Sequence, residues 1–89
     1  MTKLNISFGY NAWKEYIEWK KEDKATSKKI DKLIKDILRH PFTGLGKPEP
    51  LKANLTGNWS RQINHKDRFV YAVTKTEIQI KQLKYHYDK

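Results

Sequence analysis

The 89-residue sequence has no cysteine, no long apolar run, and ten acidic residues against nineteen basic ones. Without cysteine, the chain can form neither disulfides nor thiolate metal sites. No apolar run approaches the roughly 20 residues that a membrane-spanning helix needs, and the first ten residues lack the apolar core of a signal peptide. We therefore expect one cytoplasmic domain over residues 1–89, with no role for a membrane.

The shortage of acidic residues leaves a formal net charge of +9. An excess of this size on a small domain favours a polyanionic partner such as nucleic acid, an acidic protein or an anionic membrane. The alternative is a lysine-rich composition without such a partner. A hydrophobic content of 37%, with three Trp, five Tyr and three Phe, indicates a folded chain and not a disordered one.

The first half of the chain predicts a strand followed by two helices. Residues 4–8 alternate apolar and polar, which is typical of a half-buried strand. Asn11 is a candidate cap for a helix that runs to about Glu22. Thr26 or Ser27 is a candidate cap for a second helix, which ends before Pro41 because proline disfavours helical geometry in the residue before it. The apolar residues of this second helix keep an uninterrupted helical spacing: Ile30, Leu33, Ile34, Ile37 and Leu38.

The second half predicts a loop and then strands separated by turns. All three prolines lie in residues 40–50, which we expect to form a loop. The predicted strands cover residues 51–55, 59–63, 68–74 and 78–85. The third of these is apolar on both faces, so we expect it in the centre of the sheet. The alternation of the last strand slips between Ile80 and Leu83, which predicts a β-bulge. The fold class is α+β, with two antiparallel helices on one face of a small antiparallel sheet.

The stretch GKPEPLK, residues 46–52, holds one carboxylate between two basic residues. Glu49 stands between two prolines, and Lys47 and Lys52 flank the trio. Proline fixes its own φ and restricts the residue before it, so this segment should be extended and stiff. A loop that only connects two elements does not need such stiffness. The alternative is a surface ion pair of Glu49 with a lysine, worth about 0–1 kcal/mol.

RNA cleavage by the 2′-hydroxyl needs a base, an acid and cations that stabilise the charged transition state. Glu49, His86, Arg68 and Lys52 supply these groups without a metal or cofactor. Strand-borne members of the set can converge on the sheet face that the helices leave bare. Two alternatives stay open from the residues alone. Trp59 is either a core residue or a base-stacking platform, and His86 is either frayed and inert or positioned by the last strand.

The segments GKPEPLKANLTGNWSRQI (46–63), DRFVYAV (67–73) and the terminal YHY (85–87) resemble the YoeB/Txe toxins of bacterial toxin–antitoxin pairs, within the RelE-like superfamily. The resemblance covers nearly the whole chain. It implies a RelE-like, microbial-RNase-like fold and a ribosome-dependent endonuclease that cuts mRNA in the decoding site and stops translation. It also implies an acidic antitoxin of the YefM/Axe type as partner. Dimerisation of the free toxin is left open.

The resemblance assigns roles to individual residues. Glu49 corresponds to the family's general base and His86 to its general acid, while Arg68 and Lys52 correspond to residues that stabilise the transition state or position phosphate. The further residues expected to contact RNA are Lys47, Trp59, Arg61, Gln62 and Tyr87. The family often reads W-S-R-R-I, and the second arginine of that motif is Gln62 here. Cleavage is then slower, or Arg61 compensates.

Two non-enzymatic functions compete with the nuclease prediction. The chain could block the ribosome or bind RNA without cutting it, a reading that the uncharged Gln62 favours. It could also be an interaction protein whose positive charge serves only an acidic partner. Mutation of Glu49 or His86 separates cleavage from both alternatives, because only cleavage needs a base and an acid.

Overall fold

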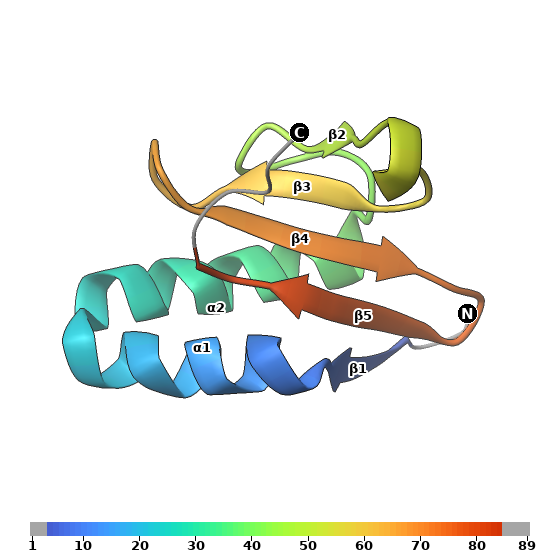
Figure 1. Cartoon of the computed structure of the whole chain (residues 1–89). Helices are drawn as coiled ribbons and strands as arrows, with labels where there is room; N and C mark the ends of the chain where they lie inside the picture. Colours follow the sequence, from blue (N-terminus) through green and yellow to red (C-terminus); the bar gives the residue numbers. More distant parts are fainter. Residues whose placement is uncertain (1–3, 85–89) are drawn as a thin grey trace.

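Strand β1 (Asn5–Phe8) leads directly into helix α1 (Tyr10–Glu22), and helix α2 (Lys24–Arg39) begins after a single intervening residue. The computed structural model describes residues 4–84 of the chain (Figure 1). After α2 come a short strand, a 3₁₀ turn and three longer strands: β2 (Glu49–Pro50), η1 (Ala53–Leu55), β3 (Trp59–Gln62), β4 (Arg68–Val73) and β5 (Glu77–Gln82).

The strands form one sheet in the order β1-β5-β4-β3-β2, and both helices lie along the same face of it (Figure 1). The predicted fold class is confirmed, as is the central place of β4. One pairing departs from the expectation of an antiparallel sheet, because β1 runs parallel to β5. After β1 the two helices lead to β2 at the opposite edge of the sheet, and the chain returns through β3 and β4 to β5, so a long connection joins the parallel pair.

The core lies between the helices and the sheet. The spacing of α2 places Ile30, Leu33 and Ile37 against the sheet, where each is almost fully buried. Phe69 and Tyr71 alternate on the facing side of β4, and neither is exposed to solvent. Because strand side chains alternate between faces, Arg68 and Val70 project from the opposite side of β4.

The predicted helix caps are wrong in position. Gly9 precedes α1 in place of Asn11, and Asp23 caps α2 in place of Thr26 or Ser27. The Asp23 carboxylate accepts a hydrogen bond from the backbone N–H of Thr26 at 3.1 Å and another from the Thr26 hydroxyl at 2.8 Å. The backbone bond, followed by the hydroxyl bond, lowers the pKa of Asp23. A carboxylate at this position satisfies donors that the first turn of a helix leaves free.

The strand predicted for residues 51–55 is also wrong. Ala53 adopts a left-handed backbone with φ 57°, and residues 53–55 form the 3₁₀ turn η1. Local bonds stabilise this turn, since the Thr56 hydroxyl donates to the Ala53 carbonyl and the Asn58 amide donates to the Leu55 carbonyl. The sheet pairing falls slightly earlier, on Glu49 and Pro50.

The predicted bulge in the last strand is confirmed. Val70 of β4 faces Gln82, whereas the next residue, Tyr71, faces Ile80, so Lys81 is the extra residue. The insertion lets both Ile80 and Leu83 point into the core despite their odd spacing, and Leu83 is fully buried. Strand β5 ends at Gln82, and Tyr85, the predicted end, lies outside the described residues.

None of the helices within residues 4–84 is both long and apolar enough to cross a lipid bilayer.

Candidate functional site

The sheet face that the helices do not cover, here called the open face, carries Glu49, Ser60, Gln62, Arg68 and Val70. Their positions follow from strand register. Glu49 lies opposite Ser60, and Ser60 lies opposite Val70. Gln62 lies opposite Arg68 in the neighbouring row. Directly opposed residues project to the same face of a sheet, so these five side chains lie on one face. Glu49 is exposed, Gln62 and Arg68 are half-buried, and Ser60 and Val70 are buried.

The register also sets the separation of the two charged members of this surface. Arg68 stands two strands across and two residues along from Glu49. With standard strand spacings, their Cα atoms are about 12 Å apart. The two residues therefore lie on the same face but in different rows of the sheet. The Arg68 Nη1 donates to the carbonyls of Asn64 at 2.9 Å and Asp67 at 3.3 Å, which restricts the guanidinium.

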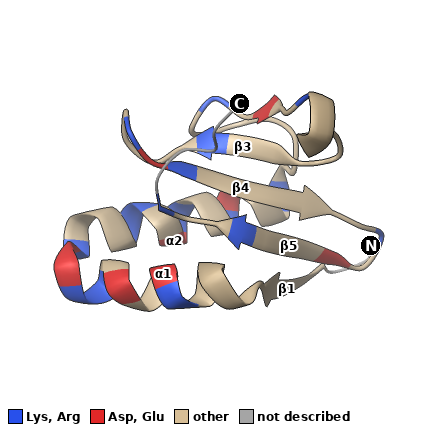
Figure 2. Cartoon of the chain, viewed as in Figure 1, with Lys and Arg blue, Asp and Glu red and all other residues tan. Residues whose placement is uncertain are grey.

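A groove beside β2 brings Glu49 and Lys52 together. It has a volume of about 410 Å³ and is lined by residues 49–55. Glu49, Lys47 and Lys52 are all exposed. Figure 2 shows acidic β2 between basic segments of the chain on either side. The structure thus places the predicted base and one predicted cation on a single accessible surface.

The extended conformation predicted for GKPEPLK holds at Glu49 and Pro50, which form β2, and fails at Lys47. Lys47 has a left-handed backbone with φ 52°, next to Gly46 with φ 79°. The chain turns sharply here because the Gly46 carbonyl accepts a 2.7 Å hydrogen bond from the Gln62 backbone N–H. A Cβ on Gly46 would lie 3.1 Å from both the Arg61 Cβ and the Leu33 Cδ2, so the turn needs glycine.

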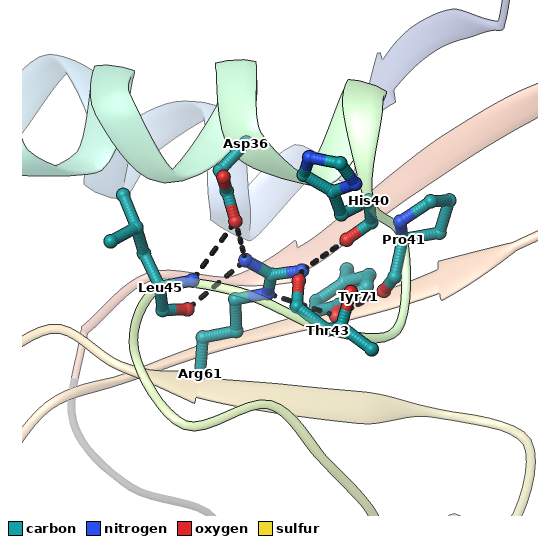
Figure 3. Close-up of polar contacts among 7 residues, drawn as sticks. All are labelled: Asp36, His40, Pro41, Thr43, Leu45, Arg61 and Tyr71. Carbon is teal, nitrogen blue, oxygen red and sulfur yellow. Dashed lines mark hydrogen bonds and ion pairs between the residues drawn. The ribbon is translucent and has the colours of Figure 1, made fainter.

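Arg61 does not belong to the open face. It is fully buried, and its guanidinium lies between α2 and the loop that follows it (Figure 3). The Arg61 Nη1 forms an ion pair with the Asp36 Oδ2 at 2.6 Å. The guanidinium makes four further hydrogen bonds, with the Tyr71 hydroxyl and with the carbonyl oxygens of His40, Thr43 and Leu45. We call this group the Arg61 cluster.

Contacts and burial in the Arg61 cluster shift the pKa values of Asp36 and Tyr71. The hydrogen bond from Arg61, followed by one from the Leu45 backbone N–H, lowers the pKa of Asp36. Burial raises the pKa of Tyr71, although its hydrogen bond with Arg61 opposes the shift. The Tyr71 hydroxyl donates onward to the Pro41 carbonyl at 2.7 Å, which adds a further tie between the loop and the sheet.

The prediction that Arg61 contacts RNA is therefore wrong for this structure, because its side chain is enclosed and its donors are occupied. Trp59 lies two residues away and projects to the same helix-covered side. Its ring packs against Phe42 at 4.7 Å between centroids and contacts the core. Of the two alternatives for Trp59, packing is the one this arrangement favours. A signal for both residues was present in the sequence, because Trp59, Arg61 and the buried Ile63 alternate on one face.

Two predicted site residues, His86 and Tyr87, lie outside the described residues. The described chain ends at Lys84, two residues past β5, which is the neighbour of β4 in the sheet. Within residues 4–84, no group of three or more His, Asp or Glu side chains is placed to hold a metal ion. The structure therefore unites Glu49, Lys52, Gln62 and Arg68 on one side of the molecule and removes Arg61 and Trp59 from that set.

Residues 8–87 match the family described as YoeB-like toxin of bacterial type II toxin–antitoxin system. The chain is 48% identical to Toxin YoeB of Escherichia coli (strain K12), over 94% of this chain and 100% of that protein. It is 45% identical to Toxin YoeB of Streptomyces coelicolor over the same shares of the two chains.

Solved structures of YoeB proteins have the same fold as this chain. The YoeB/ParE toxin from Agrobacterium tumefaciens has a TM-score of 0.92 at 38% identity, covering 94% of this chain and all of that one. A YoeB dimer from Staphylococcus aureus has a TM-score of 0.89 at 47% identity, covering 97% and 100%. A mutant of YafQ from E. coli, at 14% identity and a TM-score of 0.78, shares the fold.

Replacement of Arg61 by methionine should lower the free energy of unfolding by about 3–5 kcal/mol, because it leaves Asp36 and several loop carbonyls without their donor. Urea titration at pH 7 measures the change. The matched control is Arg39→Met, an exposed arginine at the end of α2, which should shift stability by no more than about 0.5 kcal/mol. Equal, small changes in both variants would contradict the structural role of Arg61.

The contribution of Asp36 should depend on pH. Its folded-state pKa lies below the ordinary value of 3.8, so its ionisation stabilises the fold above about pH 4, and this stabilisation is lost as pH falls further. At pH 7, Asp36→Asn should therefore be less stable than wild type, and the gap should shrink below pH 4. Urea titrations of both proteins between pH 2.5 and 7 measure the gap, and the comparison cancels the contribution of Asp23. A gap that stays constant with pH would refute this assignment.

Proposed function

The chain belongs to the family of YoeB-like toxins of bacterial type II toxin–antitoxin systems, and we propose that it acts as a ribosome-dependent endoribonuclease that cuts mRNA in the decoding site. The observation that carries the proposal is the shared open face of Glu49, Gln62 and Arg68, with Lys52 in the adjoining groove. A carboxylate and two cations on one side of the molecule suit a phosphodiester substrate.

The proposed reaction is an attack of the ribose 2′-oxygen on the adjacent phosphorus. Glu49 takes the proton of the 2′-hydroxyl, and the 2′-oxygen forms a bond to phosphorus while the bond to the 5′-oxygen breaks. His86 gives a proton to the departing 5′-oxygen. The products are a 2′,3′-cyclic phosphate and a 5′-hydroxyl. Arg68 and Lys52 stabilise the negative charge that gathers on the phosphoryl oxygens, and no metal or cofactor takes part.

The pairing of β2 with β3 supports the role of Glu49. Its backbone is fixed in the sheet, and Pro50 follows it directly, so its side chain starts from a defined point. A base held in place loses little entropy on reaching the transition state, and small displacements are costly. The net charge of +9 adds a general attraction for the ribosome and its message, and a cytoplasmic location follows from this target.

We further propose an acidic antitoxin of the YefM/Axe type as the partner. S. aureus YoeB, at 46–47% identity to this chain, has been solved in YoeB–YefM complexes, one of them heterotetrameric. An acidic segment complements the excess of nineteen basic over ten acidic residues. The S. aureus YoeB dimer supports self-association of the free toxin in the same way.

A second candidate function is translation inhibition without cleavage. Gln62 favours it, because this residue faces Arg68 on the open face and carries no charge where the family often has arginine. Glutamine still binds phosphate oxygens, but it stabilises developing negative charge less than a guanidinium does. The two candidates differ in whether mRNA is cut.

Replacement of Glu49 by glutamine should reduce mRNA cleavage by about 10²- to 10⁴-fold, because the amide cannot take the proton of the 2′-hydroxyl. His86→Gln should have an effect of the same order. Primer extension on mRNA from a translation extract measures the cuts. The control is Glu77→Gln, which changes a glutamate on β5 at the far side of the sheet and should cut like wild type. Translation arrest with intact message in wild type would support the second candidate, and normal cutting by Glu49→Gln would remove Glu49 as the base.

Replacement of Gln62 by arginine should raise the cleavage rate by up to about tenfold, since a charge-assisted hydrogen bond to the phosphoryl group is stronger than a neutral one. Gln62→Leu removes the polar group at similar size and should lower the rate. The same extract assay with saturating ribosomes compares the three proteins. If all three cut at one rate, this position does not contact the reacting phosphate.

A further inference from the structure

Side chains of α1 hold the backbone that follows β5. The Glu15 Oε1 accepts two hydrogen bonds, from the backbone N–H of Leu83 at 2.7 Å and from that of Lys84 at 3.0 Å. The Trp19 Nε1 donates to the Leu83 carbonyl at 2.9 Å. Both backbone polar groups of Leu83 are thus bound by the helix. We call Glu15, Trp19, Leu83 and Lys84 the C-terminal anchor.

Two members of the anchor are buried, and the other two, Glu15 and Lys84, are half-buried. Leu83 is fully buried, and Trp19 is 8% exposed. Strand β5 ends at Gln82, so the sheet no longer fixes the chain at these positions, and α1 takes over that task. Glu15 and Trp19 are four residues apart in the helix, so both side chains reach the same stretch of backbone.

Lys84 adds a charged contact to the same helix face. Its Nζ lies 3.0 Å from both the Glu18 Oε1 and the Glu22 Oε1, and over the Trp19 ring. Burial alone would lower the pKa of Lys84, but its hydrogen bonds with Glu18 and Glu22 prevail and raise it. These carboxylates are well exposed, so we assign the fixing of the backbone to Glu15 and Trp19.

We propose that Glu15 is a positioning residue for RNA cleavage, which fixes the backbone of residues 83 and 84 and thereby sets the start of the segment that carries His86. This inference rests on the function proposed above. Only Tyr85 separates the anchor from His86 in the sequence. A fixed starting point removes backbone freedom that would otherwise be lost when the imidazole meets the leaving oxygen. Glu15 touches neither RNA nor the reacting atoms in this role.

The test compares Glu15→Ala with Glu15→Gln and Asp31→Ala. Alanine removes the acceptor, whereas the carbonyl oxygen of glutamine can still accept from both N–H groups. Asp31 is the matched control, because its carboxylate also accepts an interelement hydrogen bond, from the Tyr16 hydroxyl at 2.9 Å between α1 and α2. Circular dichroism and urea titration give the folded fraction of each protein, to which all rates are normalised.

Glu15→Ala should lower kcat by about 10- to 100-fold with KM for programmed ribosomes changed less than twofold. Glu15→Gln should restore most of the rate, and Asp31→Ala should cut like wild type. An unchanged kcat in Glu15→Ala would overturn the proposal, as would equal losses in Glu15→Ala and Asp31→Ala, because the latter indicates general destabilisation.

A second readout does not depend on cleavage. The imidazole ¹H–¹³C signals of His86 should move in Glu15→Ala, stay near their wild-type positions in Glu15→Gln, and be unchanged in Asp31→Ala. If wild type cuts no RNA, the proposed function fails, while moved His86 signals would still establish that Glu15 positions this segment. Unmoved His86 signals in Glu15→Ala would overturn the positioning itself.

Discussion

The buried guanidinium of Arg61 is the constraint on which the rest of the structure depends. Residues 40–48 form no helix or strand, so their carbonyl groups need partners from elsewhere. Arg61 supplies donors to three of them and balances its own charge with Asp36. A buried charge is tolerated only when it is paired and fully hydrogen-bonded, and this one is. The loop therefore reaches β2 along one path, and that path determines where Glu49 enters the open face.

A second fixed point lies just after β5, where α1 holds the backbone. The two points are built in the same way. Each uses side chains of a helix or strand to satisfy irregular backbone, and each precedes a predicted catalytic residue by a short stretch of chain. Glu49 follows the Arg61-bound loop, and His86 follows the anchored Leu83 and Lys84. Groups that act on one phosphodiester can thus be carried on separate segments and still start from rigid positions.

Most of the fold could be predicted from the sequence. The spacing of α2 and the alternation of β3 and β5 indicate which side faces the core, and the two apolar faces of β4 indicate its central place. The slip before Leu83 predicted the bulge, which the structure has at Lys81. The strand predicted at 51–55 does not form, because local hydrogen bonds around Ala53 outweigh its β pattern. The role of Arg61 was missed for another reason. Its side-chain partner Asp36 lies 25 residues away, and its carbonyl partners lie 16 to 21 residues away. Only the tertiary structure brings Arg61 and these partners together. Glu49, in contrast, could be singled out in the sequence because a proline stands on either side of it.

The loop and α2 together hold the Arg61 guanidinium rigidly. The most direct measurement is the ¹⁵N-edited NMR spectrum of arginine side chains in the wild-type protein at low temperature. Arg61 should give separate, slowly exchanging Nη proton signals, because its bonds to Asp36, His40, Thr43 and Leu45 oppose rotation of the guanidinium. Exposed Arg39 should give averaged, rapidly exchanging signals. Averaged signals for Arg61 like those of Arg39 would show that the loop and α2 do not hold its guanidinium.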